Sequence, residues 1–307
     1  MKVKTIVTIV LTLLGVAIGG YFLYATFRQY SAAEVIASVK ALPVDQFVLA
    51  LVYAAASYLC LAVLEGLAIS YSGKSLPMGR IGLSSFVSLS IGHSIGLGGL
   101  SSGAIRYRYY SRWGLSAEEI AKVVLMCGLS VVVGTVCLTG IVTIFNANDA
   151  SKALRLRPDE VVAIGAACLA FVAAYLGVAA LRSEPVRLWK WHVQFPSLKL
   201  SIYQTVLATL NFSLVSACLY HSFGAADATY FKSATAFVLA NIAVLVANSP
   251  GGLGVLEATV NHVMQTENVV GGLIAFRLAY FLIPLALGVV TGIAAEMTFK
   301  AKSYQAE

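Results

Sequence analysis

The sequence predicts an all-α polytopic membrane protein with about six full transmembrane spans and two re-entrant helical hairpins in an inverted repeat. Of the 307 residues, 59% are hydrophobic and only 11% are charged, and the mean hydropathy is +0.84. A soluble domain contains about 25% charged residues, so this composition is typical of a chain that lies in hydrocarbon. Two glycine-rich breaks, Gly98-Gly99 and Ser249-Pro250-Gly251-Gly252, interrupt apolar segments and predict the two hairpins.

Apolar segments of about 19 residues or more follow one another along the chain. The first of them follows Lys2 and Lys4 and is longer than the core of a signal peptide, so we expect a retained signal anchor. In order, the apolar segments lie near residues 5–27, 47–70, 82–100, 119–145, 160–181, 201–222, 233–248 and 271–296.

The third and seventh segments differ from the others. The stretch Ser84–Gly103 is rich in serine and glycine and runs directly into three arginines. The seventh segment stops at Ser249-Pro250, and a short apolar helix is expected from Leu253 to about Met264. Because broken helices at membrane depth are tolerated where they line a cavity, we expect both regions to be hairpins that enter and leave on one side.

The order span, span, hairpin, span then occurs twice. The two halves are residues 1–145 and 160–307, joined by a connecting loop at 146–159, and the second half is inverted because each half crosses three times. Lys and Arg are enriched in cytoplasmic loops, and most of the 21 in this chain fall on the side of the N-terminus. We therefore expect an integral protein of the cell membrane, the inner membrane of a bacterium, with both termini in the cytoplasm.

The segment 182–199 connects the first two spans of the second half. It places Leu188, Trp191 and Phe195 on one helical face, which predicts an amphipathic helix on the cytoplasmic membrane surface. Close helix packing is predicted by small residues four positions apart, at Gly15 and Gly19, Gly92 and Gly96, and Gly288 and Gly292.

Several classes of function lack their motifs. The sequence has no GxxxxGK[ST] loop for ATP and no HExxH, GxSxG or paired-aspartate arrangement, so neither an ATP-driven pump nor an enzyme is expected. The net charge of +7 is explained by positive loops that face anionic lipid headgroups, so no nucleic-acid partner is predicted. No metal site or cofactor is expected, because the cysteines lie in apolar runs without CxxC spacing, at positions 60, 127, 137, 168 and 218.

Glu65 lies in the second apolar segment, and Arg106 follows the first break. Glu65 follows an apolar run and must be neutral, paired or hydrated if it is buried, while an alternative places it at the cytoplasmic end within reach of Lys74 or Arg80. Arg106 follows the glycines, and its guanidinium fork suits a phosphate. The alternative for Arg106 is an arginine that extends to the membrane interface. The sequence leaves both alternatives open.

Arg108 and Arg112 lie four residues apart on one helical face. Like charges at this spacing repel each other unless an anion lies between them. A lipid phosphate is one such anion, and solvated interfacial charge is the simpler interpretation.

The second break has its own charges. Glu257 lies on the half-helix after Pro250, and Arg277 stands in a strongly apolar span, where a charge is costly unless it is paired. We therefore predict an ion pair of Glu257 with Arg277, with Arg106 as the other candidate partner, while a carboxylate that binds a cation or carries a proton remains the alternative. Glu296 precedes Lys300 by four residues, which predicts a simple ion pair. His93 is expected to be hydrogen-bonded within a serine-rich half-helix rather than to relay protons.

Three motifs of this chain resemble a known family: Ser102–Tyr110 (SGAIRYRYY), Trp113–Ser116 (WGLS) and Pro250–Glu257 (PGGLGVLE). They are similar to the membrane-embedded flippase domain of lysylphosphatidylglycerol synthases, the multiple peptide resistance factors, and to its stand-alone relatives. The resemblance covers most of the chain. Ser102 departs from it, because a second glycine is expected there. The soluble aminoacyltransferase domain of the full-length family has no counterpart, so no synthesis of aminoacyl lipid is expected.

The resemblance implies a lipid translocase that moves a phospholipid, aminoacylated or not, between leaflets. The headgroup is expected between the two hairpins, with Arg106 on the phosphate and Glu65 or Glu257 receiving a cationic amine or a proton. The alternative is a non-transporting scaffold for a lipid-modifying enzyme, and a homo-oligomer is also left open. The residues expected to bind the lipid are Arg106, Glu257, Arg277, Glu65, Arg108 and Arg112, of which Arg106 and Glu257 match the family motifs.

Overall fold

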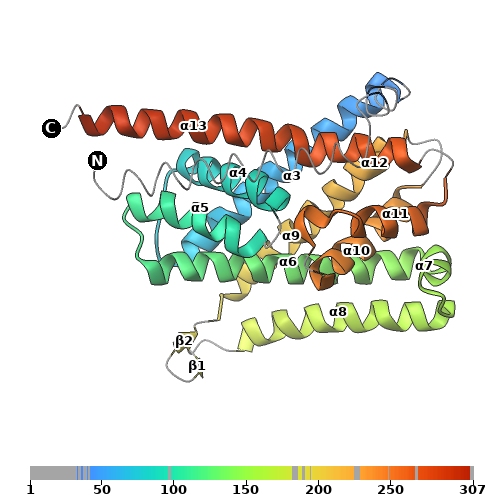
Figure 1. The fold of residues 1–307 in the computed structure, drawn as a ribbon. Coiled ribbons are helices and arrows are strands. Elements are labelled where there is room, and N and C mark those ends of the chain that lie inside the picture. The colour runs from blue at the N-terminus through green and yellow to red at the C-terminus, as the bar shows by residue number, and fades with distance from the viewer. Residues whose placement is uncertain are drawn as a thin grey trace.

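The computed structural model describes residues 33, 36, 40, 42–95, 98–181, 186–188, 191–193, 195–224, 229–247, 249–266 and 269–304. This part of the chain is helical apart from two short strands, so the predicted all-α class is confirmed (Figure 1). The main helices are α3 (Val44–Tyr71), α4 (Met78–Ile95), α5 (Gly98–Arg112), α6 (Ala117–Phe145), α7 (Ala147–Leu154), α8 (Pro158–Leu181), α9 (Leu198–Ser222), α10 (Tyr230–Ala247), α11 (Val255–Met264), α12 (Val269–Arg277) and α13 (Ile283–Tyr304).

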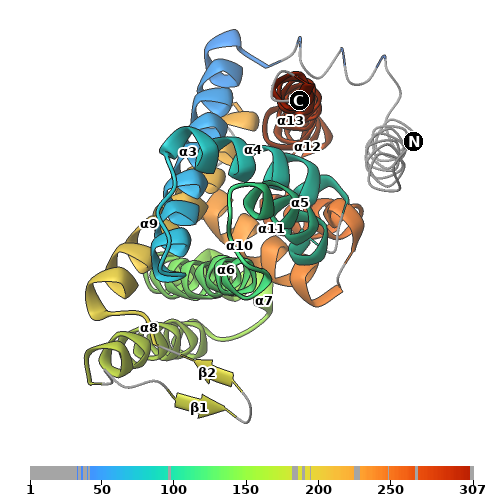
Figure 2. The same ribbon diagram turned by 90° about the vertical axis from the view of Figure 1, so that its left-hand side faces the viewer.

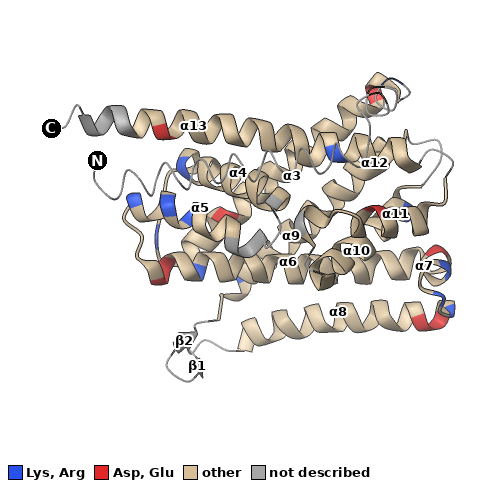
Figure 3. Cartoon of the chain, in the orientation of Figure 1, with Lys and Arg blue, Asp and Glu red and all other residues tan. Residues whose placement is uncertain are grey.

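Among the described residues, 6 helical segments are long and apolar enough to span a membrane. They are α3, α6, α8, α9, α10 and the continuous segment Val269–Phe299, which contains α12 and most of α13. Figure 3 shows long stretches of α6, α8 and α13 without charged residues. Five of these segments match predicted spans, whereas α10 had been assigned to a hairpin. The predicted span at 5–27 lies outside the described residues.

The chain turns at both predicted breaks. Helix α5 begins at Gly98 and packs against α4 (Figures 1 and 2). After α5, Ser116 caps the N-terminus of α6. At the second break, a single 3₁₀ turn over Pro250–Gly252 reverses the chain between α10 and α11, which pack together. Gly251 and Gly252 have φ of 58° and 64°, a region that favours glycine. That each helix pair enters and leaves the membrane on one side, as one part of an inverted repeat, stays a prediction.

The connecting loop predicted at 146–159 contains the short helix α7. Around it, small residues bring the long helices into close contact. A Cβ at Gly134 of α6 would lie 2.8 Å from the backbone of Ala208 on α9, and Gly140 and Gly165 join α6 to α8 in the same way. Close backbone approach at small residues stabilises helix pairs in membranes. These contacts fix α6 as the central helix against which α8 and α9 pack.

The predicted small-residue contact on α13 is confirmed. Gly288 lies against Ser90 of α4, and Gly292 lies against Val87 one turn away. A Cβ at Gly288 would overlap the Ser90 hydroxyl and would lie 2.8 Å from its Cβ. Glycine at position 288 therefore sets how closely α13 approaches the first hairpin. Gly15, Gly19 and Gly96 lie outside the described residues.

Replacing this glycine is expected to separate α13 from α4. Gly288→Ala should lower the free energy of unfolding by about 1–3 kcal/mol, because overpacking forces the helices apart. Adding Ser90→Gly, which removes the opposing side chain, should restore most of the loss. Gly177→Ala is the matched control, because nothing lies within 4 Å of a Cβ at that position. Unfolding in mixed micelles with increasing sodium dodecyl sulfate measures all three, and equal effects of the two alanines would contradict the packing.

The amphipathic helix predicted within 182–199 is wrong for its described part. Val186–Leu188 (β1) and Trp191–Val193 (β2) form an antiparallel pair, with Val186 opposite Val193 and Leu188 opposite Trp191. Branched and aromatic residues favour strands, and the run is too short to form a stable amphipathic helix. The pair follows the end of α8 (Figure 2). Its place on the membrane surface stays a prediction.

Candidate functional site

Near the first break, a buried ion pair joins α3 to α5. Glu65 is 1% exposed and Arg106 is 3% exposed. Arg106 Nε donates to Glu65 Oε1 and Nη2 donates to Oε2, both at 2.9 Å. This two-fold contact is the strongest geometry that an arginine and a carboxylate adopt. The alternative partners of Glu65 are therefore wrong, and Lys74 pairs with Glu119 instead. Arg106 is enclosed by the protein and does not extend from its surface.

Two hydroxyl groups complete this pair. The Tyr110 hydroxyl donates to Glu65 Oε1, and Arg106 Nη1 donates to Ser102 Oγ at 3.0 Å. Ser102, the departure from the family motif, thus provides a third acceptor for the guanidinium. Because the carboxylate is paired and hydrogen-bonded, the cost of burying both charges is largely offset.

The second break carries the predicted ion pair. Arg277 Nε donates to Glu257 Oε1 at 2.7 Å, and Nη2 lies 2.6 Å from the same oxygen. Arg277 also donates from Nη1 to the Gly251 carbonyl at 2.6 Å and from Nη2 to the Gly252 carbonyl at 3.2 Å. Glu257 Oε2 accepts from the backbone N–H of Gly254 at 2.8 Å. The Glu257–Arg277 pair is confirmed, and it holds the backbone of the glycine turn.

Arg277 ends α12 and is followed by a π-helical turn at Leu278–Leu282. Its guanidinium lies 4.9 Å from the centroid of the Phe281 ring. A turn of this kind widens the helix locally and is frequent at functional sites. Here it places Tyr280 and Phe281 next to the second break.

The third group of charges lies apart from the breaks. Arg108 Nη2 is 2.8 Å from Glu296 Oε2, and Arg112 donates to both oxygens of Glu296, at 2.8 Å and 3.1 Å. The anion between the two arginines is therefore a carboxylate of α13. Glu296 pairs with two arginines that are far from it in the sequence. The predicted pair with Lys300 stays a prediction, because the Lys300 side chain lies outside the described part.

Removing this carboxylate is expected to have a modest effect that depends on salt. Glu296→Gln should lower the free energy of unfolding by about 1 kcal/mol at low salt, because partly exposed ion pairs contribute little and Arg108 and Arg112 then repel each other. High salt should reduce the loss. Unfolding curves at two salt concentrations measure it, with Glu118→Gln, in the exposed pair with Lys122, as the control. A loss that does not change with salt would contradict this account.

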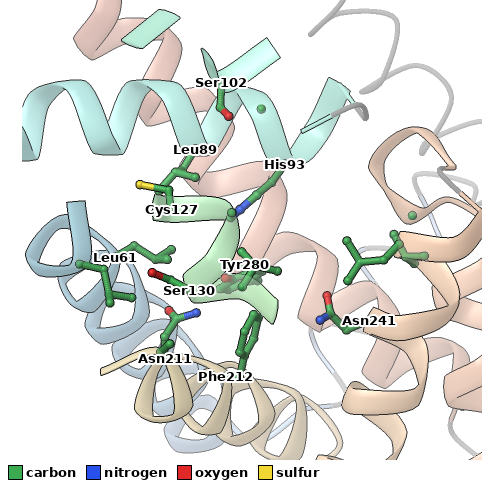
Figure 4. Close-up of a pocket in the computed structure, with 18 of the residues that line it drawn as sticks. Leu61, Leu89, His93, Ser102, Cys127, Ser130, Asn211, Phe212, Asn241 and Tyr280 are labelled. Carbon is green, nitrogen blue, oxygen red and sulfur yellow. The ribbon is translucent and has the colours of Figure 1, made fainter. Parts of the chain in front are cut away.

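A cavity of about 340 Å³ lies where the two breaks meet (Figure 4). The first hairpin contributes residues from α4 and α5 and the second contributes the glycine turn, while α3, α6, α9, α10 and the π-helical turn close the remaining sides. The residues from the two breaks are Gly92, His93, Ser102 and Arg106, and Ser249, Gly251, Gly252 and Leu256. Segments far apart in the sequence therefore share one space.

The predicted binding residues divide into three groups around this cavity. Arg106 lines it, and Glu65 lies directly behind Arg106. Glu257 and Arg277 are not among the lining residues, but Arg277 binds the carbonyls of Gly251 and Gly252, which are. Arg108 and Arg112 are not among the lining residues. Of these six residues, only Arg106 lines the cavity.

Most polar side chains in the cavity bind other side chains. Asn211 Oδ1 accepts from the Ser57 hydroxyl at 2.7 Å, and Asn241 Nδ2 donates to Thr135 Oγ1 at 3.0 Å. These asparagines and the Tyr110 hydroxyl were not among the residues predicted from the sequence. Their signal was an amide within an apolar span, which is rare unless it has a partner or a function.

Two residues that line the cavity each have one polar atom without a hydrogen-bond partner among the described residues. These atoms, His93 Nδ1 and Ser249 Oγ, are enclosed by protein and do not face the cavity. The prediction of a hydrogen-bonded His93 is therefore wrong at Nδ1, because the ring packs against Tyr280 with the centroids 6.1 Å apart. The stacking orients the imidazole without satisfying this nitrogen.

Two lining residues of the cavity, one on α6 and one on α10, are exposed, which indicates that the cavity opens on this side. Gly128 of α6 and Leu245 of α10 both line it and are exposed on the outer surface. Nothing lies within 4 Å of a Cβ at Gly128, so the space beside it is free. Both helices are long and apolar enough to span a membrane, which places this mouth on an apolar side of the molecule.

Comparisons with known proteins agree with the motifs. The chain is 31% identical over 263 residues to the uncharacterized protein slr0712 of Synechocystis, an alignment that covers 84% of this chain and 82% of that protein. It is 25% identical over 242 residues to the inner membrane protein YbhN of Escherichia coli, with 76% and 75% covered. Residues 12–288 match the model of the lysylphosphatidylglycerol synthase transmembrane region. The chain is a membrane protein and belongs to the lysylphosphatidylglycerol synthase transmembrane-region family.

Proposed function

We propose that the protein is a lipid translocase that moves a polar lipid between the two leaflets, a phospholipid being the class that the family suggests. The observation that carries this proposal is the cavity, which lies between two broken helices and has exposed lining residues on α6 and α10. Broken helices that meet inside a membrane protein are where carriers bind their substrates. A lateral mouth suits a lipid, because the headgroup can enter while the acyl chains remain in the bilayer.

The two ion pairs have different tasks in this mechanism. Glu257 and Arg277 fix the glycine turn, whose backbone forms one wall. Glu65 occupies the fork of Arg106, so this arginine meets a headgroup through its remaining N–H groups, as a hydrogen-bond donor beside a neutral pair. A phosphate clamped by the whole fork would require the pair to open first.

The remaining features of the proposal follow from the sequence. The protein works without a cofactor and not as an enzyme, and it lies in the inner membrane of a bacterium with both termini in the cytoplasm. Both hairpins are re-entrant. The competing function is a scaffold for a lipid-modifying enzyme. The pairing of both arginines with carboxylates favours this function, because a purely structural role needs no charge that is free to bind a ligand.

Reconstitution separates the two functions. Purified protein is placed in liposomes that carry a fluorescent phospholipid, and a membrane-impermeant quencher measures how fast inner-leaflet probe becomes accessible. A translocase should accelerate this exchange at least about tenfold over liposomes with a heat-unfolded sample of the same protein. A scaffold should leave the rate unchanged with anionic, zwitterionic, aminoacylated and sugar-bearing probes alike, although the protein remains folded.

A further inference from the structure

We infer that the Arg106–Glu65 pair is a proton-coupled site for an anionic lipid headgroup: the headgroup replaces Glu65 at the arginine, and Glu65 takes up one proton. This inference rests on the proposed lipid translocation and names the class of lipid and the ion that moves with it. Three observations support it: the position of the pair, its charge balance, and an unpartnered hydroxyl group near Tyr110.

The pair presents its positive member to the cavity. Arg106 is the one lining residue of the described chain with a formal charge, and Glu65 lies behind it on α3. An arginine has five N–H donors, and its bonds to Glu65 and Ser102 use three of them. The other two, one on Nη1 and one on Nη2, make no hydrogen bond among the described residues. An anion in the cavity therefore meets the guanidinium before the carboxylate.

Charge balance then requires a proton. Glu65 and Arg106 together have no net charge, and Glu65 is 1% exposed. A phosphate that takes the guanidinium leaves this buried carboxylate without a counter-charge, and binding a proton removes the resulting cost. Movement of Arg106 toward the anion also opens a path from the cavity to Glu65. The proton comes from water and bonds to a Glu65 oxygen, so one phosphate anion and one proton are taken up together.

The structure has a place for the additional hydrogen. The Tyr110 hydroxyl donates to Glu65 Oε1, whereas a protonated Glu65 must donate to Tyr110, whose oxygen can accept. Tyr110 then needs another acceptor for its own hydrogen. The Ser84 hydroxyl of α4 lies near that of Tyr110 and is buried without a hydrogen-bond partner in the described chain. Buried polar groups are normally hydrogen-bonded, and the protonated state supplies the missing bond.

Other titratable groups near the pair do not replace Glu65 in this role. Cys127 of α6 and His93 of α4 lie near Arg106. Among the described residues, however, the hydrogen bonds of Glu65 are with Arg106 and Tyr110 alone. Glu65 is therefore the group that loses its counter-charge when an anion takes Arg106, and the proton binds there.

A pH gradient across proteoliposomes tests the coupling. Trace fluorescent phosphatidylglycerol, which is anionic, or phosphatidylcholine, which is zwitterionic, is added to liposomes of unlabelled phosphatidylcholine. Valinomycin and equal potassium on both sides hold the membrane potential at zero. An interior one pH unit more acidic than the outside should concentrate phosphatidylglycerol about tenfold in the outer leaflet, relative to liposomes without a gradient. Phosphatidylcholine should not respond. Phosphatidylglycerol that exchanges but ignores the gradient overturns the coupling.

Proton uptake on binding tests the site without transport. The purified full chain in weakly buffered detergent is mixed with phosphatidylglycerol, a pH-indicator dye measures the protons, and native mass spectrometry counts the bound lipid. About one proton should be taken up per bound lipid, and none with phosphatidylcholine. No binding, or binding without uptake, overturns the inference. Equal binding of glycerophosphoglycerol, the same headgroup without acyl chains, would assign the site to a soluble anion and overturn the lipid.

Two serines of α4 provide matched variants. Ser84→Ala removes an acceptor that Tyr110 needs only in the protonated state, so it should leave the fold intact and weaken phosphatidylglycerol about fivefold, the effect of one hydrogen bond. Ser85→Ala is the control, because Ser85 is the next residue and is also buried and unpartnered. Equal effects of the two variants overturn the assignment. Glu65→Gln cannot take up the proton, and uptake that persists in this variant also overturns it.

The outcomes also separate this inference from the proposed function. Uptake of one proton on binding, without exchange across a bilayer, would keep the site and refute translocation. Exchange of phosphatidylglycerol that does not respond to the pH gradient would keep translocation and refute the coupling.

Discussion

Glu65→Leu is expected to lower the free energy of unfolding by about 3–5 kcal/mol, because it leaves a buried arginine without its counter-charge. Arg106 is 3% exposed, and its guanidinium donates two hydrogen bonds to Glu65 and one to Ser102. The guanidinium cannot lose its charge, so it must remain unpaired, draw in water or pull α5 away from α3. Any of these changes would also distort the cavity wall that Arg106 forms.

A second substitution tells an unpaired charge from lost packing. Arg106→Met added to Glu65→Leu replaces the pair by apolar side chains and should recover most of the stability, since such replacements are often neutral. Glu118→Leu is the control for the substitution itself, because Glu118 forms an exposed pair with Lys122. Unfolding in mixed micelles with sodium dodecyl sulfate measures the series. A double variant no more stable than Glu65→Leu would contradict the assigned role of the pair.

Arg277→Lys is expected to cost about 2–4 kcal/mol although it keeps the positive charge. Arg277 binds the carboxylate of Glu257 and the carbonyls of Gly251 and Gly252 at once. A lysine ammonium lacks the planar fork that reaches all three acceptors, so buried carbonyl groups would lose their donors. The left-handed backbone of the turn should then open.

Hydrogen exchange of residues 249–257 measures this opening, and detergent unfolding measures the stability. Protection of the Gly254 N–H, which donates to Glu257, should fall in Arg277→Lys. Arg157→Lys, at an exposed pair with Asp159, is the matched control and should change neither. Unchanged exchange in the turn of Arg277→Lys would show that the arginine does not hold it.

The sequence was sufficient where one physical rule acted alone. Composition fixed the membrane class, and the cost of an unpaired charge in hydrocarbon led from Arg277 to Glu257 without any structure. The same rule gave the wrong partners for Glu65, because Lys74 and Arg80 are its neighbours in sequence and Arg106 is its neighbour only in the folded chain. Proximity in sequence is a poor guide to pairing between helices.

Other features could be recognised only in the folded structure. The cavity combines residues from α3 to the π-helical turn, and no local pattern shows that their side chains meet. No sequence pattern distinguished Arg106, which lines the cavity, from Arg108, which pairs with Glu296. Their positions around the axis of α5 determine which side each side chain faces. The sequence predicts a helix where Val186–Leu188 and Trp191–Val193 form strands, because three residues are too few to establish a period of two.

Blocking the mouth of the cavity tests the central claim most directly. Gly128→Phe places a ring in the free space beside an exposed lining residue of α6, whereas Gly177→Phe places the same ring in free space on α8, which contributes no lining residue. Lipid exchange in liposomes is measured for both variants after each is shown to be folded. The account predicts exchange at least about tenfold slower for Gly128→Phe and unchanged for Gly177→Phe. Equal rates in the two variants would contradict a lipid path through this cavity.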